Sequence, residues 1–281
     1  MTDSVRVPLP RSVLASYLVL APAAAADPDL VISRRAGELL PAAREQLAGV
    51  IGDLRVHDLA PLRTAPVPPT ALLRAYGASA AQCEQVAAAS AGWALLLRQR
   101  PQAAQTGESA VRSAAMLLAR ELDGEVIDPA IPRLVRVDPS ATASSVTTDW
   151  HSFDHVPGQA GTDVSTRGLV RFGLPELAVR DIPPAAVPAW DAILSGVVHL
   201  VMRRLRGAEE SRSDPGLDLP AKLPLTVRDI AAAYGQPVET VDPTVRRETK
   251  LRLSYVEGPE DRLISITACS DAVADLFGEA D

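Results

Sequence analysis

Short apolar runs, each closed by a proline or a polar cluster, recur through the first half of the chain. Five of them have the length and composition of a strand: "SYLVLAP" (16–22), "DLRVHDL" (53–59), "GWALLLRQRP" (92–101), "EVIDP" (125–129) and "RLVRVDP" (133–139). The segments between them place apolar residues at helical spacing, over residues 33–51, 80–90 and 107–124. Ser79 and Gln82 form a capping box before the second of these helices, and Gly124 suits the C′ position of the third. Strands and helices therefore alternate up to residue 138.

The second half has a different pattern. "SVTTDWHSFDHV" (145–156), the turn "PGQAGTD" (157–163) and "VSTRGLVRFG" (164–173) predict a hairpin, which spans residues 147–177 with its return. A surface loop is expected over residues 209–224, followed by a helix with Thr226 as its N-cap. Residues 187–206 predict an amphipathic helix, whose apolar face holds Trp190, Ile193, Leu194, Val197, Val201 and Leu205. Residues 246–257 predict a strand with one buried face, formed by Thr249, Leu251, Leu253 and Tyr255.

These elements predict an α+β fold of two packed halves, with mostly antiparallel sheets covered by helices. Residues 1–138 form an N-terminal α/β half. Residues 147–281 form a C-terminal α+β half that contains the hairpin 147–177 and the helix 187–206. The small, polar stretch "PSATASSVT" (139–147) marks the boundary between them.

Composition narrows the class of protein. The chain has 281 residues, of which 47% are hydrophobic and 22% charged, as in a folded globular protein. Its net charge of −7 makes nucleic acid an unlikely partner. Lys222 and Lys250 are the only lysines among 28 basic residues, which together with many alanines and prolines suggests a GC-rich bacterial genome. Cys83 and Cys269 are expected to be two buried thiols in a reducing cytoplasm.

The N-terminus allows two interpretations. Arg6 and Arg11 precede an apolar run and an alanine cluster, which imitates a secretory signal peptide over residues 1–26. Asp3 and several prolines argue against it, so we expect residues 16–22 to be a buried strand of a cytoplasmic protein. No other stretch approaches the roughly 18 apolar residues of a transmembrane segment.

The hairpin is the best place to look for a site, because we expect exposed aromatic and histidine side chains to gather there. On a strand His151 and His155 share one face with Asp149 and Phe153, so the two histidines and a nearby aspartate could bind zinc. Neither an HExxH motif nor a third nearby histidine accompanies them. The alternative is a half-exposed strand. The candidate binding residues are Trp150, His151, Phe153, His155, Arg167, Arg171 and Glu176, with His151 and His155 as the candidate metal ligands.

Other constellations are weaker. Asp191, Ser195 and His199 share a helix face, but the serine lies between the acid and the histidine, which is not the order of a catalytic triad. "LTVRDIAAAYGQPVETV" (225–241) resembles the start of a helix-turn-helix, but Asp242-Pro243 interrupts the second helix. No nucleotide-binding or serine-hydrolase motif is present, and no cofactor is expected.

Residues 165–177, "STRGLVRFGLPEL", contain Thr166, Gly168, Leu169, Phe172, Gly173, Pro175, Glu176 and Leu177. This stretch resembles the T-x-G-[LM]…[FL]-G-x-P-E-[LI] pattern of an uncharacterised family of bacterial domains of unknown function. The helix and strand of "LARELDGEVIDP" (118–129) look like those found upstream in that family. The resemblance covers about half of the chain and implies an α+β fold, without an activity to carry over.

Two function hypotheses follow. The first is a non-enzymatic binding or interaction protein of a bacterial cytoplasm, sequestering a toxin, a small natural product or a partner protein. The alternative is a metal-assisted or acid–base hydrolase that uses His151 and His155 together with Asp154 or Asp163, near Glu176. An exposed strand edge or a broad apolar patch would favour binding, whereas a deep pocket that gathers those side chains would favour the hydrolase. The ligand, the partner and the oligomeric state do not follow from the sequence.

Overall fold

The computed structural model describes residues 4–25, 27–135, 146–208, 215–236, 247–257 and 262–278. The chain forms two compact units. We call residues Ser12–Ser144 the N-terminal unit, and Met1–Arg11 together with Ser145–Asp281 the C-terminal unit. The predicted α+β class is confirmed, since helices pack on three mostly antiparallel sheets.

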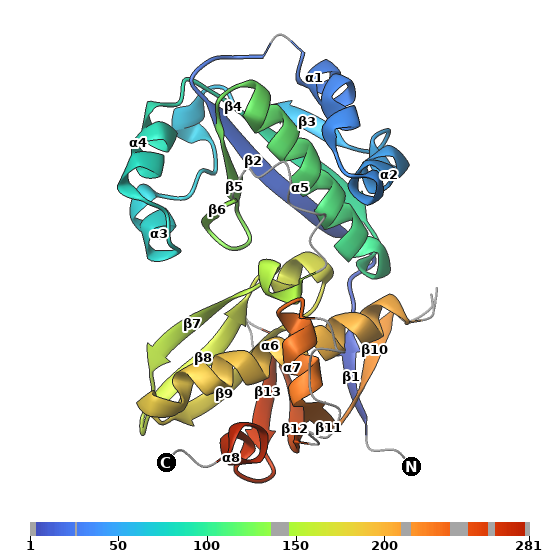
Figure 1. The fold of residues 1–281 in the computed structure, drawn as a ribbon, viewed down its shortest axis with the longest axis vertical. Coiled ribbons are helices and arrows are strands. Elements are labelled where there is room, and N and C mark those ends of the chain that lie inside the picture. Colours follow the sequence, from blue (N-terminus) through green and yellow to red (C-terminus); the bar gives the residue numbers. More distant parts are fainter. Residues whose placement is uncertain are drawn as a thin grey trace. The chain divides into compact units, whose positions relative to one another are not determined.

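The N-terminal unit is built on a five-stranded antiparallel sheet (Figure 1). Its strand order is β3 (Arg55–Asp58), β4 (Ala91–Gln99), β2 (Val13–Ala21), β5 (Glu125–Asp128) and β6 (Arg133–Val135). The predicted strand at residues 16–22 is thus the central strand β2, which pairs with both β4 and β5. β3 lies at one edge of the sheet and β6 at the other.

Helices cover both faces of this sheet. One face packs against α1 (Pro28–Arg35), α2 (Pro41–Val50) and α5 (Ala104–Glu121), and the other against α3 (Thr70–Ala75) and α4 (Ala80–Ala88). Tyr17 and Val19 of β2 face the first group, whereas Leu18 and Leu20 face the second. A strand buried on both faces has no polar side, which explains the continuous apolar run at 16–22.

The C-terminal unit contains a six-stranded sheet and a separate two-stranded sheet (Figure 1). The six strands run in the order β11 (Lys222–Thr226), β12 (Glu248–Glu257), β13 (Arg262–Ala268), β9 (Glu176–Ile182), β8 (Thr162–Arg167) and β7 (Ser152–Pro157). Only the β13/β9 pair is parallel. The second sheet pairs β1 (Ser4–Pro8) with β10 (Gly216–Pro220). The helices are α6 (Val187–Arg206), α7 (Val227–Ala233) and α8 (Ala272–Phe277).

Six short 3₁₀ helices complete the described elements: η1 (Ala36–Glu38), η2 (Leu62–Thr64), η3 (Pro101–Ala103), η4 (Thr147–Asp149), η5 (Leu169–Phe172) and η6 (Pro184–Ala186).

Several local predictions are confirmed. Helix α6 has the predicted bounds, and all six predicted apolar residues are buried in it. The capping box of Ser79 and Gln82 is present, and Thr226 caps α7. Thr249, Leu251 and Leu253 lie on the buried face of β12. Each of these rests on a local pattern that burial or capping fixes directly.

Other predictions are wrong. The sequence predicts a loop over residues 209–224, but Gly216–Pro220 forms β10 and Lys222–Thr226 forms β11. Their leucines Leu217, Leu219, Leu223 and Leu225 alternate inward, and edge strands tolerate the prolines that resemble loop signals. Strand β8 ends at Arg167, and residues 169–172 turn as η5. Cys83 is buried, but Cys269 is exposed.

The end of α5 differs by one residue from the expectation. Asp123, not Gly124, takes the left-handed conformation, with φ of 50°. The amide of Gly124 then donates to the carbonyl of Ala119, as in a Schellman motif. A Cβ at Gly124 would lie 2.5 Å from the carbonyl oxygen of Leu20. The glycine is therefore needed for the close approach of β2.

Two earlier expectations fall outside the described residues: the boundary segment 139–145 and the interrupted second helix of residues 237–246. Within the described residues, the segment Pro184–Arg206 is long and apolar enough to cross a membrane by length and composition alone, and 56% of its apolar window is buried. Core helices of soluble proteins pass the same test.

Candidate functional site

The predicted hairpin forms and packs beside helix α6. Three polar residues of α6, spaced four apart, each contact a hairpin residue, and these partners are also spaced four apart. Thr147 contacts His199, His151 contacts Ser195, and His155 contacts Asp191. Asp191, Ser195 and His199, which share one face of α6, therefore each make a polar contact with the hairpin.

His151 and Ser195 form a buried pair. The imidazole Nδ1 of His151 donates to the carbonyl oxygen of Thr147 at 3.1 Å, so Nε2 of a neutral ring accepts. The Ser195 hydroxyl lies 3.2 Å from Nε2 and 2.9 Å from the carbonyl oxygen of Asp191, and its single proton is donated to one of these two acceptors at a time. Ser195 has no exposed surface, and the Asp191 carboxylate contacts His155 instead of His151. This geometry satisfies polar groups in the core and offers a substrate no access to the serine.

His155 lies nearer the surface. Its Nε2 is 3.0 Å from Asp191 Oδ1, and the two side chains are 41% and 24% exposed. The ring of Phe153 contacts the rings of both His151 and His155, which confirms that these three side chains share a face. Among the residues that the structure describes, no three His, Cys, Asp or Glu side chains are grouped to hold a metal ion.

His199 completes the contacts along α6. Burial lowers the pKa of this histidine, Arg203 lowers it further, and Asp229 acts in the opposite direction. The Thr147 hydroxyl, 3.1 Å from its Nδ1, contacts a ring that favours the neutral form.

The aromatic side chains of the hairpin are less exposed than expected. Trp150 and Phe172 are buried and meet edge to face, with ring centroids 6.3 Å apart. Phe153 is half-buried. The expectation of exposed aromatics in this segment is wrong, because these rings fill the core between the hairpin and its neighbours.

Glu176 organises the corner that follows the hairpin. Its carboxylate accepts hydrogen bonds from the Thr166 hydroxyl at 2.7 Å and from the amides of Gly168 and Leu169 at 2.8 and 2.9 Å. Gly168 and Gly173 flank η5 with φ of 116° and 73°, which glycine adopts without strain. Burial raises the pKa of Glu176, although these hydrogen bonds favour its charged form. The T-x-G-L…F-G-x-P-E-L pattern thus describes a structural corner.

The two candidate arginines also have local partners. Arg171 is buried, and its Nε donates to the carbonyl of Gly168. Arg167 is exposed and pairs with Asp154 on the adjacent strand β7. The seven candidate binding residues therefore lie around one hairpin and its return, each in a contact that the fold explains.

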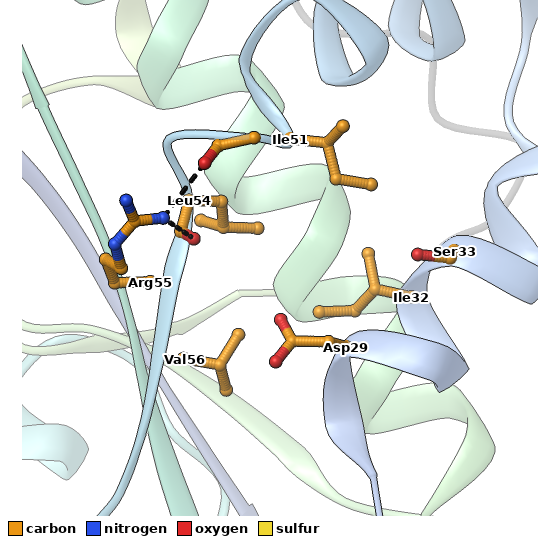
Figure 2. A pocket seen from close by; sticks show the side chains of 8 residues that line it. Asp29, Ile32, Ser33, Ile51, Leu54, Arg55 and Val56 are labelled. Carbon is orange, nitrogen blue, oxygen red and sulfur yellow. Dashed lines mark hydrogen bonds between the residues drawn. The ribbon is translucent and has the colours of Figure 1, made fainter.

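A cavity of about 400 Å³ lies elsewhere, in the N-terminal unit (Figure 2). It separates α1 from β3 and from the end of α2. Buried Ile32 and Leu54 line it together with the partly exposed Ile51 and Val56. Asp29, Ser33, Gly52 and Arg55 complete the lining.

The two charged side chains that line this cavity, Asp29 and Arg55, differ in their hydrogen-bond partners. One guanidinium nitrogen of Arg55 donates to the carbonyls of Gly52 and Leu54, on the opposite side of β3 from Asp29 (Figure 2). The carboxylate of Asp29 has no hydrogen bond or ion pair within the described residues. Figure 2 shows it beside Ile32 and Val56, directed toward the space between α1 and β3.

Ion pairs hold the α1 wall of the cavity in place. Arg34 and Arg35 both pair with Glu121 of α5, and Arg35 also pairs with Glu38. At the other end of α1, Asp27 caps the helix by accepting from the amide of Leu30. The ion pairs therefore anchor the C-terminal end of α1, and the Asp27 cap stabilises the first helical turn, which contains Asp29.

The edge strand β3 leaves backbone groups unused. The amide of Leu59 donates to the carbonyl of Gly92, which continues the β3/β4 register. Every second residue of an antiparallel strand bonds the same neighbour, so the backbone groups of Arg55 and His57 also face β4. Val56 and Asp58 consequently direct their N–H and C=O groups away from β4, where no strand pairs with β3 in the described part of the chain.

Sequence reasoning predicted the strand at 53–59 but not its significance. Edge position depends on sheet order, and the cavity depends on how α1 packs, so neither leaves a local signal. No protein-family model, curated protein or solved structure matches this chain.

Proposed function

We propose that the chain is a non-enzymatic interaction protein of a bacterial cytoplasm, which binds an extended segment of a partner protein along the edge of β3. The observation that carries this proposal is a coincidence of two features. Val56 and Asp58 present unused backbone groups, and the cavity opens beside the same strand. An added strand gains main-chain hydrogen bonds from such an edge, and an adjoining pocket selects alternate side chains.

A polypeptide suits this edge better than a toxin-like small molecule or a natural product. The outward donors and acceptors of Val56 and Asp58 repeat at the spacing of another extended backbone. β3 has only four residues, a length that limits the edge to a short segment. Such a site recognises a linear segment of a partner more readily than a large folded surface.

Selection of random peptides on the immobilised full chain tests the proposal. We expect wild-type protein to enrich peptides that bind in an extended form. Val56→Pro removes one outward N–H without breaking a β3/β4 hydrogen bond, because prolines are tolerated where an edge strand faces solvent. Binding of the enriched peptides to this variant should fall at least about tenfold, as expected for losing roughly 1.4 kcal/mol.

Val56→Thr is the matched control, because it keeps the N–H and the approximate shape of the side chain. It should bind the enriched peptides like the wild type, and far-UV circular dichroism should show both variants folded. The same peptides with alternate backbone amides methylated should lose binding to the wild-type protein. No enrichment, or equal binding of methylated and unmethylated peptides, would contradict strand addition at β3.

A further inference from the structure

We infer that the bound segment carries a lysine or arginine opposite Val56, and that Asp29 recognises its charge. This inference rests on the proposed strand addition to β3. It goes further by assigning the cavity between α1 and β3 to one class of side chain.

The register of an added strand determines which side chain enters the cavity. A residue directly opposite Val56 projects from the same face of the sheet as Val56 itself. Val56 packs against the cluster that contains Ile32, Leu47 and Leu54, on the α1 side of the sheet. The residue opposite it therefore points into the space between β3 and α1.

The walls of the cavity suit a long side chain with an apolar stem. Ile32 and Leu54 are 1% and 6% exposed and provide a buried apolar surface, while Ile51 and Val56 are partly open to solvent. Lysine and arginine place their methylene groups on such surfaces and keep the charged end near water.

The negative charge at the cavity favours a basic side chain over an uncharged or acidic side chain of similar length. Asp29 supplies a carboxylate without a partner in the described residues, whereas Arg55 is already engaged by two carbonyls on the other side of the strand. Asp27 lies two residues away and adds negative charge, so an acidic side chain would be repelled. Asp29 is exposed, so we expect a modest selectivity of about fivefold, as for an exposed ion pair.

The test uses four pools of capped, fluorescent heptapeptides and the full chain. The central residue is lysine, arginine, norleucine or glutamate, and the flanking positions are mixtures of valine, threonine and serine. Anisotropy titrations should give about fivefold tighter binding for the lysine and arginine pools than for norleucine, and the weakest binding for glutamate. Asp29→Asn should bring the lysine and norleucine pools to equal affinity. Asp53→Asn should retain the preference, because it changes net charge equally at a residue that does not line the cavity.

The outcomes separate this inference from the proposed function. Equal affinity of the lysine and norleucine pools for the wild type, or a basic preference that survives Asp29→Asn, would overturn recognition by Asp29 and leave strand addition standing. Failure of every pool to bind the wild-type chain, or undiminished binding to Val56→Pro, would overturn both.

Discussion

Glu176 illustrates how one side chain can decide a local path of the backbone. Its carboxylate joins the end of β8, the start of η5 and the start of β9 through hydrogen bonds to Thr166, Gly168 and Leu169. The Thr166 hydroxyl also accepts from the amide of Leu177. Burying this group costs desolvation, which its hydrogen bonds offset in part.

Replacing Glu176 tests this role. Glu176→Ala leaves two amides and a hydroxyl without their acceptor, and should lower the free energy of unfolding by about 1–3 kcal/mol. Glu176→Gln keeps an acceptor for both amides and should cost less. Urea unfolding followed by tryptophan fluorescence measures both, since Trp150 and Trp190 lie in the same unit. Equal stability of the alanine variant and the wild type would contradict the role.

The raised pKa of Glu176 gives the same experiment a pH dependence. The folded state holds the proton to higher pH than the unfolded state, so this group favours folding below about pH 4.5. That contribution disappears as pH rises through the folded pKa. Glu176→Gln cannot titrate, so its stability relative to the wild type should increase over this range.

At the scale of elements, the close approach of β2 explains the glycine at position 124 better than a role in ending helix α5 does. Gly124 follows α5 where β2 passes, and a Cβ there would meet the carbonyl oxygen of Leu20. Gly124→Ala should therefore destabilise the protein by about 1–3 kcal/mol through overpacking. Calorimetric unfolding of the full chain measures the change.

Gly49 provides the matched control. It lies in helix α2, and a Cβ there would meet nothing within 4 Å. Gly49→Ala should raise stability by up to about 1 kcal/mol, because alanine favours the helix. A stabilising effect at both glycines would refute the assigned contact between residue 124 and β2.

The sequence predicted those elements in which buried apolar residues recur at the regular spacing of a helix or a strand. Helix α6 and strand β12 expose one face and bury the other, so their spacing was sufficient. β1, β10 and β11 were missed because their prolines resemble loop signals, and edge strands tolerate proline. The contact of His151 with Ser195 joins residues 44 apart, and the edge of β3 depends on strand order. Neither follows from a local pattern.

At the scale of the whole molecule, the N-terminal unit is a continuous segment and the C-terminal unit is not. Residues 12–144 contain every strand of their own sheet, so this segment should fold alone with a cooperative unfolding transition. Residues 145–281 lack β1, whose Val7 is fully buried, and should be less stable than the same unit in the full chain. Denaturant unfolding of the two fragments tests both statements, and restored stability on adding a peptide of residues 1–11 would confirm the cause.

The pairing of β1 with β10 also has a consequence during synthesis. Arg6 and Asp218, which pair across these strands, are separated by 212 positions. At about 5–20 residues per second, a ribosome needs roughly 10–40 s between the synthesis of β1 and that of its partner β10. The N-terminal unit can fold completely in that interval. β1 is thus synthesised long before its partner β10, and the growing chain carries β1 as an unpaired strand throughout this interval.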